Sequence, residues 1–125
     1  MQKIQRFTDL VAWREGHKLV LEIYKITSNF PQKEAYALTD QMRRCVVSIT
    51  SNIAEGFSRR TNKEKAQFYY MSLGSTTELQ NQLLIARDLK YMDKDMFNEL
   101  ANCTIHVHKL LYGLIKSSKT LISNT

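Results

Sequence analysis

The sequence predicts an all-α protein folded as an antiparallel up-and-down four-helix bundle. Two observations lead to this fold class: only four Gly and one Pro occur in 125 residues, and long segments repeat apolar residues every three or four positions. β-Sheet proteins need turn residues about every ten positions, so this composition favours a few long helices. The length suits one domain, and we expect a single bundle to span residues 1–125.

The first two helices are expected at about residues 9–29 and 34–58, on either side of Pro31. Asp9 or Thr8 suits the N-cap of the first helix, because either side chain can accept a hydrogen bond from an unpaired N–H group. The core stripe predicted for the first helix is Leu10, Trp13, His17, Val20 or Leu21, and Tyr24. The stripe predicted for the second is Leu38, Met42, Cys45 or Val46, Ile49, Ile53 and Phe57.

The third and fourth helices are expected at about residues 62–90 and 93–120. Thr61 and Glu64 have the spacing of a capping box, and Asp93 is the expected cap of the fourth helix. The third stripe is Phe68, Met71 or Ser72, Ser75, Leu79, Leu83, Ala86 and Leu89. The fourth is Met96, Leu100, Cys103, Val107, Leu110 and Leu114. The short connections predict that successive helices pack antiparallel.

Glycine positions predict close packing between helices. Gly16 and Gly74 fall inside helical segments, where Gly costs about 1 kcal/mol relative to Ala. We therefore expect a neighbouring backbone to approach both residues. Gly56 lies where the second helix is expected to end.

The titratable residues do not form the constellations that catalysis or metal binding require. None of the glutamates has a histidine three positions later, the spacing used by carboxylate-bridged metal sites in bundles. His106 and His108 point to different sides of a helix, and His17 is expected to be a core or interface residue. Cys45 and Cys103 fall on core positions, where a thiol is an unreactive small hydrophobe. We therefore expect no enzyme, cofactor or metal.

Cysteine content and hydropathy predict a cytoplasmic protein. Two cysteines cannot form a disulfide framework, which indicates a reducing compartment. No apolar run approaches the roughly 20 residues of a membrane span, and the first residues lack the apolar run of a signal peptide. We expect no membrane partner.

The second helix carries a polar stripe beside its apolar one. Its members, at spacings of three and four, are Gln41, Arg44, Ser48, Asn52, Glu55 and Arg59. These amides, hydroxyls and arginines suit specific hydrogen bonds better than plain surface lysines and glutamates would. The stripe is either a solvated face or an interface, between helices of one bundle or between subunits.

Basic residues are unevenly distributed along the chain. The formal charge is +6, with twelve Lys/Arg and seven Asp/Glu in residues 1–65 against six and five in residues 66–125. Two clusters, Arg43-Arg44 and Arg59-Arg60 with Lys63 and Lys65, suit contacts to phosphates. Tyr69 and Tyr70 follow the second cluster, where they could stack on bases or lie in the core. The alternative is a basic surface that serves solubility.

The segment from Gln41 to Asp88 resembles the 23S ribosomal RNA intervening-sequence proteins, and the likeness extends over about residues 7–115. Gly74-Ser75, Trp13 and the Phe30-Pro31 turn also fit that family, and Thr50 departs slightly from it. The main motif residues are Gln41, Arg43, Arg44, Ser48, Ile49, Asn52, Ile53, Ala54, Glu55, Gly56, Arg59, Glu78 and Leu83. The resemblance implies a four-helix bundle that assembles into a homopentamer and has no established catalytic activity. A related branch comprises accessory proteins of diversity-generating retroelements, which partner a reverse transcriptase.

Two roles are expected for the polar residues of the resemblance. We expect a polar network within the bundle or between subunits, and basic residues that hold phosphate. The network comprises Gln41, Arg44, Ser48, Asn52, Glu55 and Glu78. The phosphate-binding candidates are Arg43, Arg44, Arg59, Arg60, Lys63 and Lys65, with the roles of Arg43 and Arg44 open between the two.

The sequence thus predicts a non-enzymatic, homo-oligomeric protein that binds RNA or another nucleic acid. Two alternatives remain open. One is an accessory protein of a retroelement whose partner is a reverse transcriptase. The other is a protein-assembly scaffold without nucleic acid, whose basic face serves solubility.

Overall fold

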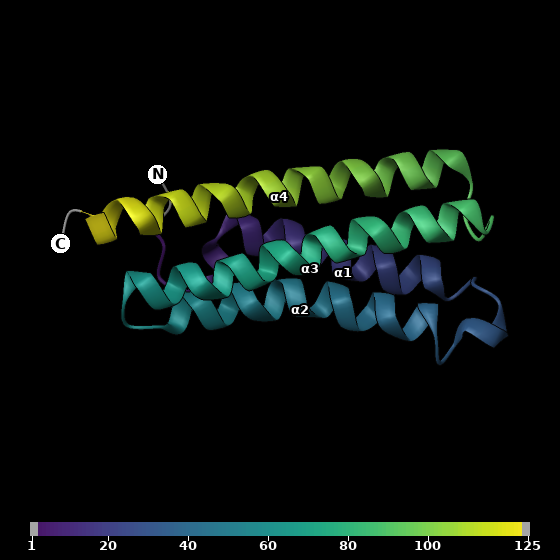
Figure 1. Ribbon diagram of the computed structural model, residues 1–125, viewed down its shortest axis with the longest axis horizontal. Helices are drawn as coiled ribbons and strands as arrows, with labels where there is room; N and C mark the ends of the chain where they lie inside the picture. Colours follow the sequence, from purple (N-terminus) through teal and green to yellow (C-terminus); the bar gives the residue numbers. More distant parts are fainter. Residues whose placement is uncertain (1–2, 124–125) are drawn as a thin grey trace.

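The computed structural model describes residues 3–123, so residues 1–2 and 124–125 of the predicted domain lie outside the described residues. Its four α-helices run up and down as long antiparallel rods (Figure 1). They are α1 (Val11–Thr27), α2 (Leu38–Ser58), α3 (Asn62–Asp88) and α4 (Lys94–Ser123). Two 3-10 turns, η1 (Phe7–Asp9) and η2 (Gln32–Glu34), precede α1 and α2.

Each helix packs against two others and the bundle closes on itself. α2 and α4 each contact both α1 and α3, while within the described part of the chain no Cα atoms of the diagonal pairs come within 8 Å of each other. Helices account for every regular element between residues 3 and 123. The all-α, up-and-down bundle is confirmed.

Thr61 and Asp93 cap α3 and α4 as predicted, but the capping box predicted for Thr61 and Glu64 is only half formed in the described chain, because the Glu64 carboxylate bonds to the Thr61 hydroxyl and not to its backbone N–H. The Thr61 hydroxyl oxygen accepts a hydrogen bond from the backbone N–H of Glu64 at 3.2 Å, and the hydroxyl donates to the Glu64 carboxylate at 3.0 Å. The Asp93 carboxylate accepts from the backbone N–H of Met96 at 2.8 Å. These bonds satisfy N–H groups that have no partner inside the helix.

The first helix begins two residues later than predicted, because Asp9 has a different role. Its carboxylate accepts the backbone N–H groups of Gln5 and Arg6, each at 3.0 Å, and so caps η1. These two bonds, which favour the charged form, lower the pKa of Asp9 below its usual value. Leu10 then takes the N-cap position of α1 without a side-chain bond.

The second helix begins four residues later than predicted, because residues after Pro31 form the separate turn η2. Glu34 is the last residue of that turn, and its side chain accepts two hydrogen bonds. Its carboxylate accepts the backbone N–H of Leu38 at 3.5 Å and the hydroxyl of Tyr91 at 2.6 Å. The start of α2 is therefore tied to the connection between α3 and α4.

All four helices contribute side chains to one apolar core. The stripe predicted for α2 is buried from Leu38 to Ile53, and Phe57 at its end is half-buried. Among the large apolar side chains that are fully enclosed are Leu19, Ile23, Met42, Val46, Ile49, Ile53, Leu79, Leu83, Leu100, Val107 and Leu111.

The predicted face of α1 is correct only in part: Leu10, Trp13 and Val20 are partly buried against the core, but the fully buried face lies about one residue, or 100° of rotation, away. The buried positions are Ala12, Gly16, Leu19, Ile23 and Ile26. Tyr24 is 42% exposed, and His17 is exposed with its ring stacked on Trp13, 4.7 Å between centroids. Apolar residues occur on two sides of this helix, so its pattern fits more than one stripe.

The predicted stripe of α4 was also partly wrong. Cys103 is exposed, and the buried line runs instead through Thr104 and Leu111. Thr104 can be enclosed because its hydroxyl donates to the Ala101 carbonyl at 2.7 Å and accepts from Gln80 at 3.3 Å. In α3, Leu89 is 51% exposed rather than buried.

Side chains of α2, rather than the expected backbone, pack closely against Gly16, and nothing in the described chain packs against Gly74. A Cβ at Gly16 would lie 3.0 Å from the Thr50 methyl group on α2, and one at Gly56 would lie 2.7 Å from the ring of Tyr69 on α3. A Cβ at Gly74 would have no neighbour within 4 Å. Gly56 therefore lets α2 and α3 approach at their connection, whereas Gly74 faces open space on α3.

Candidate nucleic-acid interface

The two predicted basic clusters lie far apart on the bundle. Arg43 and Arg44 are in the second turn of α2, and Arg59 follows its last residue. At 1.5 Å per residue the clusters are separated by about 24 Å along the helix. They cannot form one compact patch within a chain.

Arg43 is a structural residue. Its Nε donates to the Thr27 hydroxyl at 2.9 Å, and its Nη2 donates to the Tyr24 carbonyl at 3.3 Å and the Ser28 hydroxyl at 3.4 Å. The guanidinium also lies 4.7 Å from the centroid of the Tyr24 ring. Its donors are thus directed at the C-terminal end of α1, where helix carbonyls lack internal partners.

Arg44 instead points into solvent. Its side chain is 81% exposed and its Nε pairs with the Asp40 carboxylate at 3.0 Å, one turn earlier in α2. An exposed pair of this kind contributes little to stability. Arg44 is available to a partner, although the neighbouring Asp40 carboxylate offsets its positive charge.

Arg59 and Lys65 hold the connection between α2 and α3. Arg59 pairs with Glu55 at 3.0 Å and lies over the Phe68 ring at 4.4 Å, with its Nε buried and without a hydrogen-bond partner in the described chain. Lys65 donates to the Phe57 carbonyl at 2.6 Å. These two cations therefore spend part of their bonding capacity on contacts within the α2–α3 connection.

Arg60 and Lys63 are the accessible members of this second cluster. Both are exposed, and neither forms an ion pair within residues 3–123. Of the two tyrosines expected nearby, Tyr69 is 3% exposed and Tyr70 is 42% exposed. Tyr69 is therefore a core residue, while Tyr70 presents its ring to solvent under the Lys119 ammonium group, 4.9 Å from the ring centroid.

The predicted polar network divides into two groups. Gln41, Arg44, Ser48 and Glu78, together with Cys45, line a shallow depression of about 280 Å³ between α2 and α3. Asn52 and Glu55 lie outside it: Asn52 donates to the Ser48 carbonyl of its own helix at 2.9 Å, and Glu55 pairs with Arg59.

The floor of this depression joins α2 to α3 by hydrogen bonds. The Ser48 and Ser75 hydroxyls bond to one another, and the Cys45 thiol donates to the Ser75 carbonyl at 3.0 Å. Burial, reinforced by the adjacent Glu78 carboxylate, raises the pKa of the Cys45 thiol to about 12. The thiol therefore stays protonated at neutral pH, which makes it a poor nucleophile.

A feature that the sequence analysis missed is an apolar outer surface on α3. Tyr70, Met71, Leu84, Ile85 and Leu89 are each 41–55% exposed. Beside it, a groove of about 310 Å³ between α3 and α4 is lined by Gln80, Leu83, Leu84, Phe97, Ala101, Thr104 and Ile105. The signal was present in the sequence, because α3 has large apolar residues off its buried stripe.

The described residues contain no group of three or more His, Cys, Asp or Glu side chains that could hold a metal ion. Within the same range, no helix combines the length and the hydropathy needed to cross a membrane. Cys45 and Cys103 are both free thiols.

Comparison with known proteins agrees with the fold and with the family resemblance. The family model described as "23S rRNA-intervening sequence protein" matches residues 8–113. A crystal structure of a protein of unknown function from the S23 ribosomal protein family of Bacteroides thetaiotaomicron VPI-5482 is similar, with a TM-score of 0.76 and 20% identity, over 85% of this chain and 99% of that one. No curated protein matches the chain significantly. Because the family model covers most of its length, the chain belongs to the 23S rRNA-intervening sequence protein family.

Proposed function

We propose that this protein is a non-enzymatic, self-assembling RNA-binding protein of the cytoplasm. The observation that carries the proposal is a net charge of +6 with exposed cations, Arg60 and Lys63, that no carboxylate of the described chain neutralises. Exposed cations of this kind favour binding to RNA phosphates, because neutralising a phosphate releases the counterions that are condensed on the nucleic acid.

The apolar outer surface of α3 supports self-assembly. The exposed residues fall in two groups, Tyr70 with Met71 and Leu84 with Ile85 and Leu89, and large exposed apolar side chains grouped in this way mark interaction sites on proteins. A second copy of the chain is the partner we propose, and the family resemblance favours a ring of five. In a cyclic assembly the contact joins two different surfaces, so the α3 surface of one copy would meet another face of the next.

The two thiols, Cys45 and Cys103, are not activated as nucleophiles. The Cys45 thiol is held protonated, and the pKa of the exposed Cys103 thiol is also raised, by desolvation from the atoms around its sulfur and by the nearby Glu99 carboxylate. Neither thiol has the lowered pKa that an activated nucleophile requires.

Light-scattering mass on a size-exclusion column, with and without a mixed-sequence RNA, tests both parts of the proposal. We expect a mass near five times 14.6 kDa, with RNA bound at about 50 mM salt and released at about 500 mM. Failure to bind RNA or DNA at the lower salt would overturn the RNA-binding role. A stable oligomer that ignores nucleic acid would favour a protein partner, such as the reverse transcriptase of a retroelement, or a scaffold.

A further inference from the structure

The net charge of the protein is concentrated in one half of the bundle. Cutting each helix at its midpoint separates residues 3–19, 49–75 and 109–123 from residues 20–48 and 76–108. The first half holds eleven Lys/Arg and four Asp/Glu, a formal charge of +7, and the second holds seven and eight, a charge of −1. The antiparallel fold therefore produces one basic end, which we define as the half that contains the α2–α3 connection.

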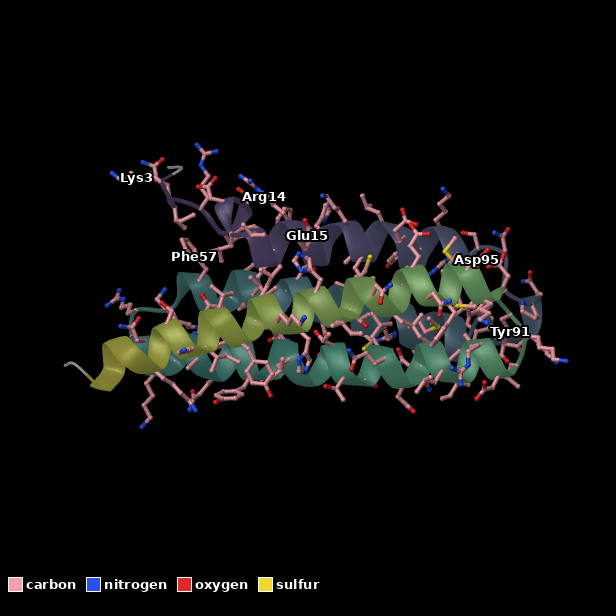
Figure 2. All side chains as sticks on the ribbon, turned by 90° about the horizontal axis from the view of Figure 1, so that it is seen from above. Lys3, Arg14, Glu15, Phe57, Tyr91 and Asp95 are labelled. Atoms are coloured by element: carbon pink, nitrogen blue, oxygen red, sulfur yellow. The ribbon has the colours of Figure 1, made fainter. Side chains whose placement is uncertain are left out.

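Three separate parts of the chain converge at the basic end. The N-terminal segment contributes Lys3 and Arg6, and Phe7 after it lines a depression together with Glu55 and Ser58 of α2. In Figure 2, Lys3 and Phe57 lie at this end, whereas Tyr91 and Asp95 lie at the opposite one. Both ends of the chain trace are also found on the side of the α2–α3 connection (Figure 1).

The α4 helix brings further cations to the same end. Lys116 and Lys119 are exposed, and the Lys119 ammonium lies 4.9 Å from the centroid of the Tyr70 ring. Tyr70 is seven residues beyond Lys63, so about 10 Å of helix α3 separates them. The exposed cations of the N-terminal segment, the α2–α3 connection and α4 thus surround one end of the bundle.

The acidic residues of the basic end are already engaged. Asp9 accepts two backbone N–H groups, Glu15 pairs with Lys18 at 3.4 Å, and Glu55 pairs with Arg59. Glu64 accepts from the Thr61 hydroxyl. These local contacts leave an excess of positive charge on the surrounding surface.

We propose that the basic end is the surface that binds RNA, through its phosphate backbone, and that the Arg43-Arg44 cluster is not. This inference rests on the proposed function and identifies the residues that perform it. Lys3, Arg6, Arg60, Lys63, Lys116 and Lys119 supply the phosphate contacts. The Arg43 guanidinium is hydrogen-bonded to α1, and Arg44 is paired with Asp40. Both arginines also belong to the half of the bundle that has no excess of positive charge.

Two triple variants of equal charge test the proposal. The first, Arg60→Gln with Lys63→Gln and Lys119→Gln, removes three exposed cations from the basic end. The matched control, Lys33→Gln with Lys90→Gln and Lys94→Gln, removes three exposed cations from the opposite end. Binding of a fluorescein-labelled single-stranded RNA of about 20 nucleotides is followed by anisotropy between about 50 and 200 mM salt.

We expect the basic-end variant to bind about tenfold or more weakly at about 50 mM salt and to lose about two units of the log–log salt slope, while the control stays within about twofold. Equal weakening of both variants, while the wild-type protein binds, would overturn this inference and leave the proposed function standing. A wild-type protein that binds no RNA would overturn the proposed function itself. If the triple variant fails to fold by circular dichroism, Lys3→Gln with Arg6→Gln, outside the helices, must weaken binding instead; unchanged binding by that variant would also overturn the inference.

Discussion

The Arg43 guanidinium on α2 donates from its Nε to the Thr27 hydroxyl in the last turn of α1, 2.9 Å away. Thr27 is 3% exposed, and its hydroxyl also donates to the Ile23 carbonyl at 2.6 Å. A side chain of one helix thus completes the hydrogen bonding of a buried hydroxyl in another. The bond explains why Arg43 is half-buried, although two adjacent arginines in a sequence usually indicate an exposed surface.

Replacing Arg43 with Ala is expected to lower the free energy of unfolding by about 1.5–3 kcal/mol, because a buried hydroxyl loses a charged donor. For a chain of this size that is a fall of roughly 5–12 °C in Tm. Thermal unfolding by circular dichroism measures it. The neighbouring substitution Arg44→Ala should cost less than about 1 kcal/mol, since Arg44 forms only an exposed ion pair. Equal losses in the two variants would contradict the structural role of Arg43.

Alanine at Gly56 and at Gly74 should shift stability in opposite directions. A Cβ at Gly56 would lie 2.7 Å from the Tyr69 ring, so Gly56→Ala should destabilise by about 1–3 kcal/mol through overpacking. Gly74 has open space around it, so Gly74→Ala should stabilise the helix by about 0.5–1 kcal/mol. Denaturant unfolding of both variants provides the comparison. A stabilising Gly56→Ala would show that the α2–α3 connection is packed less closely than described.

The two cysteines should differ in reactivity. At about pH 8 a thiol with a pKa near 12 is ionised in about one molecule in ten thousand, and Cys45 is also buried. Cys103 is exposed, so iodoacetamide should modify Cys103 first and Cys45 only after unfolding. Peptide mass spectrometry reads the order directly. Rapid modification of Cys45 in the folded protein would mean that its thiol is open to solvent.

The raised pKa of Cys45 also predicts how stability depends on alkaline pH. In the unfolded chain the thiol loses its proton near the ordinary pKa of 9.0, whereas in the folded protein it keeps it until about pH 12. The folded state therefore binds more protons in this window, and stability should fall as the pH rises from about 9 towards 12. Cys45→Ala should flatten the fall in Tm over this range relative to the wild-type protein. An identical pH dependence in both would remove Cys45 as its cause.

The apolar outer surface of α3 can be tested by placing charge in it. Met71→Glu with Ile85→Glu should shift the light-scattering mass from the oligomer towards the 14.6 kDa chain, because a carboxylate buried without a partner disfavours association. Leu21→Glu is the control, since Leu21 is 57% exposed on α1. If only the α1 variant dissociates, the interface between subunits lies on α1 and not on α3.

How far the sequence could predict this protein differs from helix to helix. On α2, the apolar residues from Leu38 to Ile53 define one face of the helix, and every predicted position on that face is buried. On α1, apolar residues occupy two sides, and the face turned inward is the one with Gly16, where a Cβ would lie 3.0 Å from the Thr50 methyl group of α2. On α4, hydropathy favours Cys103 over Thr104, yet Thr104 is buried because its hydroxyl bonds to the Ala101 carbonyl of its own helix and to Gln80 of α3.

Side-chain roles at the candidate site were harder to predict than burial. Two adjacent arginines, Arg43 and Arg44, look alike in the sequence, and successive helical residues point about 100° apart. One therefore meets α1 while the other meets solvent. The same geometry separates Tyr69, which packs under Gly56, from the exposed Tyr70.

The sequence alone determined the four helices, the caps of α3 and α4 and the net charge, because these depend on composition or on residues within a few positions of one another. It located the excess of positive charge in the first 65 residues, and the residue counts agree. Those residues do not, however, form one spatial half of the bundle. Antiparallel packing brings the start of α1, the α2–α3 connection and the end of α4 together, and so decides that the charge collects at one end of the bundle. Segments separated by more than 40 residues along the chain become neighbours only when the core forms, and no local pattern records which of their faces will meet.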